Sequence, residues 1–278
     1  MCKLLDWIRA TFFGYRPQPP LPKVGWATLS DPMAFIVQTR PDGSRATVHD
    51  LLTERRHDWP LPLGWARCES VLMDDGSVFQ AFSFVRPEHQ AGNGGQIVKV
   101  GADGFVRSVA TRDGGKSHMQ FFVGEGVGGT GWIFFGVDAP TGSWRELVAT
   151  LAESSWSGFR PAEFGRAFTR YRLEPVAFTF AVDGVTETRT VHTIISEHYD
   201  RDSIPGSGAM ERSYFGKGYG LLRWEAWGRT VEPPILDMAQ RYQWVAYSDP
   251  PGEGWHLDDI RTYTNIVRCE PTAVPMMY

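Results

Sequence analysis

The feature that most constrains this chain is a rhythm of short β-favouring runs separated by turn signals. Between residues 65 and 268, runs rich in Val, Phe, Thr, Tyr and Trp are broken by Gly, Asp and Pro at a spacing of roughly 8–12 residues. Such spacing is typical of a β-sandwich or barrel. We therefore expect an all-β fold, an antiparallel two-sheet β-sandwich of jelly-roll or concanavalin type with short peripheral helices.

Several segments refine this expectation. The turn sequences at residues 74–76, 101–104 and 183–184 predict hairpins, because Gly and Asp at these points suit tight turns. Apolar residues at helical spacing predict short helices over residues 2–13, 48–56, 143–155 and 161–172. Residues 235–244 fit either a helix or an edge strand. We expect an N-terminal extension with a proline-rich strap over residues 1–62, followed by one β-sandwich domain over residues 63–278.

Composition excludes several classes of partner. A net charge of −4 without clustered Lys and Arg argues against nucleic acid. No run reaches the ~18 apolar residues that cross a membrane as a helix. No motif for a nucleotide, flavin or haem is present, so no cofactor is expected. The sequence does not address the oligomeric state.

Cys2, Cys68 and Cys269 form neither a disulfide framework nor a recognisable zinc motif. A bridge between Cys68 and Cys269 and two free buried thiols both stay open. The N-terminus is a poor signal peptide because Asp6 and Arg9 interrupt its apolar half. A lipid-anchored start at Cys2 is an alternative, and a periplasmic or extracellular location is favoured over a cytoplasmic one.

Residues 211–229 are the most promising site. Two aromatic runs flank a centre broken by glycines, which predicts a pair of strands with a tight, irregular connection. Strand alternation places Arg212 and Tyr214 on one face, and Arg223, Glu225 and Trp227 on one face of the second arm. We expect Arg223 and Glu225 to point toward solvent or a groove. Aromatic rings beside charged groups suit a sugar-binding surface, whereas an exposed Arg223–Glu225 ion pair would contribute little.

A second cluster ends the preceding strand. In Glu197-His198-Tyr199-Asp200, alternation separates Glu197 and Tyr199 from His198 and Asp200. His198 with Asp200 is then either an oriented acid–base pair or a histidine hydrogen-bonded at a strand end. No third ligand stands at a spacing that supports a metal site.

A third pair, His118 and Gln120, shares one strand face and could hydrogen-bond the carboxylate of a uronate sugar. Residues 214–219, Tyr-Phe-Gly-Lys-Gly-Tyr, resemble the YFKxG-type strand of jelly-roll alginate lyases, with Gly216 as an extra residue. This resemblance implies that Tyr214 is the proton-transfer group at C5 of a uronate. The following G-x-G-L-x-R pattern is similar to hairpins in bacterial envelope β-proteins of unknown function.

The leading hypothesis is a carbohydrate-binding or carbohydrate-active protein of the bacterial envelope or a secreted one, with an oligo- or polysaccharide as its partner. An enzyme of this kind would be a polysaccharide lyase or a glycoside hydrolase. The candidate catalytic residues are Tyr214, Glu225 and His198. The candidate substrate-binding residues are Lys217, Arg223, Trp227, Arg212, Glu197, His118 and Gln120. The alternatives are a non-catalytic structural or interaction protein of the envelope, and a β-barrel that binds an apolar ligand.

Overall fold

A computed structural model describes residues 29–40, 42–54, 66–85, 91–112, 120–125, 131–155, 158–182, 185–229, 249–268 and 275–277 of the 278-residue chain. Helical structure in these ranges is confined to the 3-10 helix η1 (Pro32–Phe35) and the α-helix α2 (Val48–Glu54). Neither is long and apolar enough to span a membrane, and no other helix occurs in the described ranges.

The other regular elements of these ranges are strands. They are β1 (Ala66–Leu72), β2 (Val78–Val85), β3 (Ala91–Val100), β4 (Phe105–Arg112), β5 (Gln120–Glu125), β6 (Trp132–Gly136), β7 (Arg145–Ser155), β8 (Gly158–Val182), β9 (Val185–Tyr199), β10 (Ala209–Gly216), β11 (Gly220–Gly228), β12 (His256–Thr262), β13 (Asn265–Arg268) and β14 (Pro275–Met277). The predicted hairpins at residues 74–76, 101–104 and 183–184 are confirmed, because β1–β2, β3–β4 and β8–β9 pair across them.

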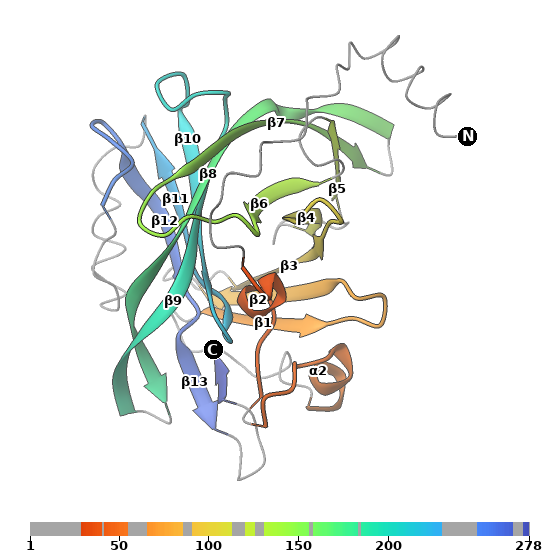
Figure 1. Ribbon diagram of the computed structural model, residues 1–278, viewed down its shortest axis with the longest axis vertical. Helices are drawn as coiled ribbons and strands as arrows, with labels where there is room; N and C mark the ends of the chain where they lie inside the picture. Colours follow the sequence, from red (N-terminus) through yellow and green to blue (C-terminus); the bar gives the residue numbers. More distant parts are fainter. Residues whose placement is uncertain are drawn as a thin grey trace.

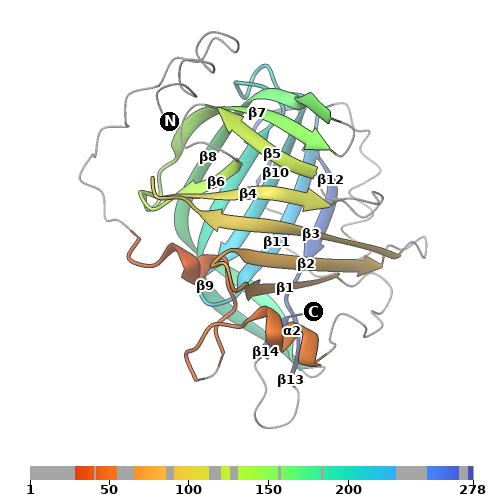
Figure 2. The ribbon, with the colours of Figure 1, turned by 90° about the vertical axis from the view of Figure 1, so that its right-hand side faces the viewer.

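The strands form two layers packed face to face (Figures 1 and 2). Strands β1–β5, with β6 beside β4, make the first layer, and β7–β12 make the second. Strand β5 joins the layers, because it pairs with β4 on one side and with β7 on the other. All named strand pairs are antiparallel except β13 with β8. The predicted all-β, two-layer antiparallel sandwich is thus confirmed.

The order of the strands is that of a meander. Strands that follow one another along the chain are hydrogen-bonded neighbours, in the order β1-β2-β3-β4-β5-β7-β8-β9-β10-β11-β12. A jelly roll instead brings together strands from distant parts of the chain. The difference arises because the short turns join consecutive strands directly, so each strand pairs with the one before it.

Aromatic side chains fill the space between the layers. The rings of Phe134 and Phe135 on β6 lie 5.1 and 5.5 Å from the ring of Phe215 on β10, measured between centroids. Residues 35–37 are buried in the same cluster. Part of the segment expected to be an N-terminal extension therefore packs into the core of the sandwich.

The strand pair predicted over residues 211–229 is confirmed as β10 and β11. Its connection is tight because Gly218 and Gly220 adopt φ angles of +84° and +74°, which other residues rarely adopt. The pairing also shifts by one residue between Tyr214 and Phe215. This irregularity is a β-bulge, which bends the strand and increases its twist.

Two predicted helices are wrong. Residues 143–155 and 161–172 lie in β7 and β8, which pair with each other along much of their length. In β7 the buried residues Leu147, Ala149 and Leu151 alternate with less buried ones, as a strand requires. Their apolar residues also fitted a helical period, so periodicity alone misassigned these runs.

Other predictions fare differently. The helix expected over residues 48–56 is confirmed as α2. The helix expected over residues 2–13 and the ambiguous segment 235–244 lie outside the described residues. Cys68 is a buried, free thiol, whereas Cys2 and Cys269 lie outside the described residues.

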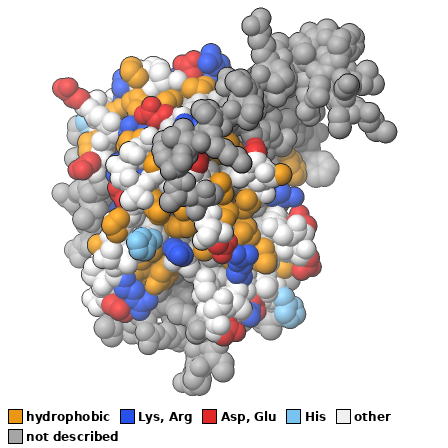
Figure 3. All heavy atoms as spheres, in the orientation of Figure 1, with side chains coloured by type: hydrophobic (Ala, Val, Ile, Leu, Met, Phe, Trp, Pro, Cys, Tyr) orange, Lys and Arg blue, Asp and Glu red, His pale blue; other side chains and the backbone are white. Residues whose placement is uncertain are grey.

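The described surface is mixed in character. On the face seen in Figure 3, acidic and basic side chains are interspersed with hydrophobic ones. Among the residues described, Phe121 is the one exposed large hydrophobic side chain. No extended apolar or singly charged area dominates the described part of this face.

Candidate functional site

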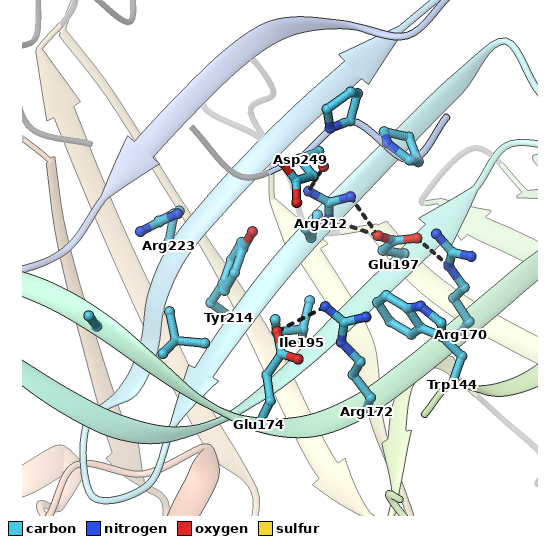
Figure 4. Close-up of a pocket in the computed structure, with 14 residues that line it drawn as sticks. Trp144, Arg170, Arg172, Glu174, Ile195, Glu197, Arg212, Tyr214, Arg223 and Asp249 are labelled. Atoms are coloured by element: carbon cyan, nitrogen blue, oxygen red, sulfur yellow. Dashed lines mark hydrogen bonds and ion pairs between the residues drawn. The ribbon is translucent and has the colours of Figure 1, made fainter. Parts of the chain in front are cut away.

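A pocket of about 450 Å³ lies over strands β8, β9, β10 and β11, on the side of the second layer that faces away from the first (Figure 4). Four arginines line it: Arg170, Arg172, Arg212 and Arg223. The wall also contains Glu174, Glu197, Trp144, Val176, Ile195, Tyr214 and, at the rim, residues 249–251. The pocket is thus rich in charge and carries two aromatic side chains.

Strand register places three of these charges in one row with Glu225, which does not line the pocket. Arg170 on β8 lies opposite Glu197 on β9, Glu197 lies opposite Arg212 on β10, and Arg212 lies opposite Glu225 on β11. Directly opposed side chains on one face are about 4.5–5.5 Å apart at their Cβ atoms. The row therefore alternates cation and anion across four strands.

The centre of the row is tightly paired. Glu197 Oε1 accepts hydrogen bonds from Arg212 Nη2 at 2.6 Å and from Arg212 Nε at 2.8 Å. Glu197 Oε2 accepts from Arg170 Nε at 2.5 Å and from the Tyr199 hydroxyl at 2.6 Å. Glu197 is fully buried and Arg212 nearly so. Removing either partner would leave a buried charge uncompensated.

Electrostatics keep this pair ionised. Burial by itself would raise the pKa of Glu197, but the positive charges of Arg212 and Arg170, with hydrogen bonds from Arg170 and Tyr199, hold it below its usual value. Burial likewise works against the Arg212 guanidinium, yet Glu197, Tyr214 and Glu225 raise its pKa above the ordinary value. The charges at the centre of the pocket wall are therefore permanent near neutral pH.

Glu225 is an acceptor shared by several donors. Its carboxylate lies 3.3 Å from Arg212 Nη1 and 3.5 Å from Arg223 Nη1. The Trp227 indole N–H donates to it at 3.0 Å and the Tyr214 hydroxyl at 3.4 Å. Glu225 therefore joins Arg212, Arg223, Tyr214 and Trp227 into one polar cluster.

Trp144 organises the β8 side of the pocket. The guanidinium carbons of Arg170 and Arg172 lie 4.3 and 4.2 Å from the centroid of its ring, and Figure 4 shows the indole between the two side chains. Arg172 also donates to Glu174 at 2.9 Å. At the rim, Arg212 Nη1 donates to the main-chain carbonyl of Asp249 at 2.9 Å. Stacking and pairing hold these side chains in place without a ligand.

The structure brings together five of the residues singled out from the sequence: Glu197, Arg212, Tyr214, Arg223 and Glu225. Their faces are those predicted by alternation. Arg223 lines a pocket, and Glu225 contacts Arg212 and Arg223, two of the arginines that line it. Both are nevertheless buried, so their ion pair is not an exposed one. Trp227 is buried as well, in a cluster with Tyr199, Met210, Trp255 and Leu257.

His198 lies on the opposite face of β9, within the core of the sandwich. Its ring lies 5.4 Å from the ring of Trp132 and 5.2 Å from that of Phe134. Its Nε2 lies 3.0 Å from Ser196 Oγ. Burial lowers the pKa of His198 to about 3, despite the opposing effects of Glu197 and of a hydrogen bond with the Ile133 main chain. The structure does not bring His198 together with Tyr214 and Glu225 in the pocket.

Three further candidates lie elsewhere. Lys217 is exposed in the turn between β10 and β11 and is not part of the pocket wall. Gln120 begins β5, which belongs to the first layer and not to the strands beneath the pocket. His118 lies outside the described residues.

Arg170, Arg172, Glu174 and Trp144 were not predicted as site residues. Arg170 and Arg172 were missed because residues 161–172 were assigned to a helix, which hid the face that they share with Glu174. The order Arg170-x-Arg172-x-Glu174 does have the period of two that marks one face of a strand. No sequence signal places Trp144 beside them, because it precedes β7 and reaches the pocket only through the fold.

The described residues contain no group of three or more His, Cys, Asp or Glu side chains arranged to hold a metal ion. Comparisons of the chain with protein-family models, with curated proteins and with solved structures find no match.

Proposed function

We propose that this protein binds a carbohydrate in the pocket over β8–β11. The observation that carries the proposal is that guanidinium and carboxylate groups line the pocket side by side: Arg170, Arg172, Glu174, Glu197, Arg212 and Arg223. Sugar hydroxyls both donate and accept hydrogen bonds, so they match a wall that offers fixed donors beside fixed acceptors. A volume of about 450 Å³ also lies within the usual range of small-molecule sites.

Polar contacts, rather than a broad aromatic platform, would hold the sugar. Trp227 is buried, and Trp144 is flanked by the guanidinium groups of Arg170 and Arg172. Because strand pairing and salt bridges already fix the polar groups, they lose little conformational entropy when a ligand binds. Polar groups that are fixed in this way can bind a ligand without large movements of the protein.

A glycan array tests the proposal. Val176 lines the pocket without belonging to the charge network, so Val176→Trp should fill the site and abolish binding. Thr179→Trp is the matched control, because Thr179 is exposed on the same strand and does not line the pocket. Binding by wild type and Thr179→Trp but not by Val176→Trp would support the proposal. Equal binding by all three would place the sugar elsewhere.

Catalysis is a separate part of the proposal. Tyr214 is the side chain best placed to transfer a proton, since its hydroxyl lines the pocket and lies 3.4 Å from Glu225. Polysaccharides that bind should be assayed for unsaturated products and for new reducing ends. Loss of turnover in both Tyr214→Phe and Glu225→Gln, with binding retained, would support an enzyme; unchanged turnover would exclude these residues from catalysis.

The rival function is that of a structural or interaction protein. One observation favours it: the centre of the charge row is buried and internally paired, as a purely structural network would be. If wild type binds no glycan on the array and Val176→Trp gives the same result, this rival function is favoured. A location in the envelope or outside the cell stays a prediction.

A further inference from the structure

We propose that the ligand of this pocket carries a singly charged oxyanion, a carboxylate or a sulfate ester, and that Arg223 receives it. The carbohydrate part of the ligand rests on the proposed function above, whereas the oxyanion rests on the charge pattern around Arg223. Among the described residues, Arg223 is the residue of β11 that lines the pocket, and it lies beside Tyr214 (Figure 4).

Arg223 is the least paired of the buried arginines in the pocket. Its one ion pair among the described residues is with Glu225, at 3.5 Å, which is the outer limit of a hydrogen bond. Its Nε is buried without a hydrogen-bond partner. By contrast, Arg212 contacts Glu197 at 2.6 and 2.8 Å. Both arginines are more than nine-tenths buried, so the difference lies in their partners and not in their exposure.

The charge balance of the connected network points the same way. Arg170, Arg212 and Arg223 provide three positive charges, and Glu197 and Glu225 provide two negative ones. Among the described residues, the five groups joined by these contacts therefore carry one more positive charge than negative charges. Glu197 makes the short contacts, with Arg170 and Arg212, whereas Glu225 lies 3.3 Å from Arg212 and 3.5 Å from Arg223. Among the described residues, no carboxylate therefore lies closer than 3.5 Å to Arg223. A buried cation without a close anion is costly, and a bound oxyanion would offset that cost.

The aromatic neighbours of Arg223 hold its guanidinium in place. The guanidinium carbon lies 4.7 Å from the centroid of the Tyr214 ring and 5.1 Å from that of Phe178. The faces of these rings stabilise the charge through cation–π contact, which does not use the guanidinium N–H groups. The planar fork of N–H groups therefore remains suited to a carboxylate or a sulfate, which arginine binds with two parallel hydrogen bonds.

This assignment differs from the expectation for His118 and Gln120 that was drawn from their shared strand face. There, the carboxylate of a uronate would contact His118 and Gln120. Gln120 does not line the pocket, His118 lies outside the described residues, and the inference depends on neither of them. It depends on the weak pairing of one buried arginine in the pocket wall.

The test compares matched sugars by calorimetry. Glucose, galactose and mannose are each compared with their uronates and with their 6-sulfates. Charged hydrogen bonds of the kind expected here correspond to about 10- to 100-fold in affinity. We expect this preference for the acidic sugars in wild type, its loss in Arg223→Gln, and partial retention in Arg223→Lys. Arg189→Gln is the control, since Arg189 pairs with Glu187 outside the pocket.

The outcomes separate the two proposals. If wild type binds neutral and acidic sugars equally, the oxyanion proposal is overturned and the carbohydrate proposal still holds. This comparison uses wild type alone, so it does not depend on whether any variant folds. Binding of uronates but not sulfates, or the reverse, identifies which oxyanion is taken. Benzoate and hexanoate provide the remaining arm: if they bind through Arg223 while no sugar binds, the oxyanion site stands and the carbohydrate proposal fails. No binding in any arm overturns both.

Discussion

The burial of His198 makes a specific prediction about stability and pH. In the folded protein the ring is neutral because desolvation lowers its pKa to about 3. In the unfolded chain a histidine has a pKa of about 6.5. Between these two values the unfolded state binds a proton that the folded state does not. The free energy of unfolding should therefore fall as the pH falls below about 6.5, and level off only near the folded pKa.

The magnitude follows from the two pKa values. At pH 4.5 the unfolded histidine is about 99% protonated while the folded one is almost entirely neutral, which costs about 2.7 kcal/mol of stability relative to pH 7.5. The result depends little on the folded value, since a folded pKa about one unit higher changes it by only about 0.1 kcal/mol. A loss of this size is a large fraction of the ~5–15 kcal/mol that stabilises a typical domain.

Urea denaturation at pH 7.5 and 4.5, followed by tryptophan fluorescence, measures the effect in wild type and in His198→Gln. The glutamine amide can retain a hydrogen bond to Ser196 but does not titrate. Wild type should lose about 2.7 kcal/mol more than the variant over this range. The matched control is His192→Gln, since His192 is exposed on the same face of β9. Parallel pH profiles for wild type and His198→Gln would show that His198 is not buried as a neutral ring.

Three further predictions concern packing and charge. Glu197→Gln should lower the free energy of unfolding, measured by urea denaturation, by about 3–5 kcal/mol, because it breaks a buried ion pair. Since the pKa of Glu197 is lowered in the folded protein, the stability that this ion pair provides is present above pH ~4 and lost on further acidification. Gly216→Ala should lower stability by about 1–3 kcal/mol, because a Cβ there would lie 2.3 Å from Leu222, whereas Gly165→Ala, with open space around it, should not lower it by overpacking. Burial raises the pKa of the Cys68 thiol to about 12, so a thiol reagent at pH 8 should modify Cys68 only after unfolding; rapid labelling of the native protein at Cys68 would refute that.

Local patterns predicted those parts of the fold that depend on neighbours in sequence. Turn sequences such as residues 101–104 located the hairpins, and period-two alternation assigned the faces of β9, β10 and β11 correctly. The runs that became β7 and β8 were misassigned, because a long strand with many buried residues can also satisfy a helical period. What decided their structure is pairing with strands elsewhere in the sheet, which no local window contains.

Only part of the candidate site could be predicted from the sequence, for the same reason. Glu197, Arg212, Tyr214, Arg223 and Glu225 were found because they lie on neighbouring strands that are close in the sequence. The β8 side of the pocket was missed, since its opposition to β9 depends on the register of a long hairpin. Burial was also beyond reach: alternation shows that Arg223 and Glu225 share a face, but not that this face is covered.

The register of β9 links the stability of the fold to the site. Glu197 and His198 are neighbours, yet one is ionised in the pocket wall and the other is neutral in the core. A slip of one residue would exchange their faces, placing a carboxylate among Phe134 and Trp132 and an uncharged ring between Arg170 and Arg212. Both placements would be strongly unfavourable, so the two residues together oppose any slip.

The bulge between β10 and β11 extends this reasoning to Arg223. Tyr214 lies opposite Arg223, but the next residue, Phe215, lies opposite Leu221, which leaves Leu222 as the extra residue. The extra residue allows Leu221 to join the core between the layers while Leu222 joins the apolar cluster beside the pocket. Arg223 stays on the pocket face, next to Tyr214. Without Leu222, Leu221 and Arg223 would be consecutive and would still lie opposite Phe215 and Tyr214. Deleting Leu222 should therefore remove the bulge and keep the preference for acidic over neutral sugars, and loss of that preference in a folded variant would show that Arg223 depends on the bulge for its position.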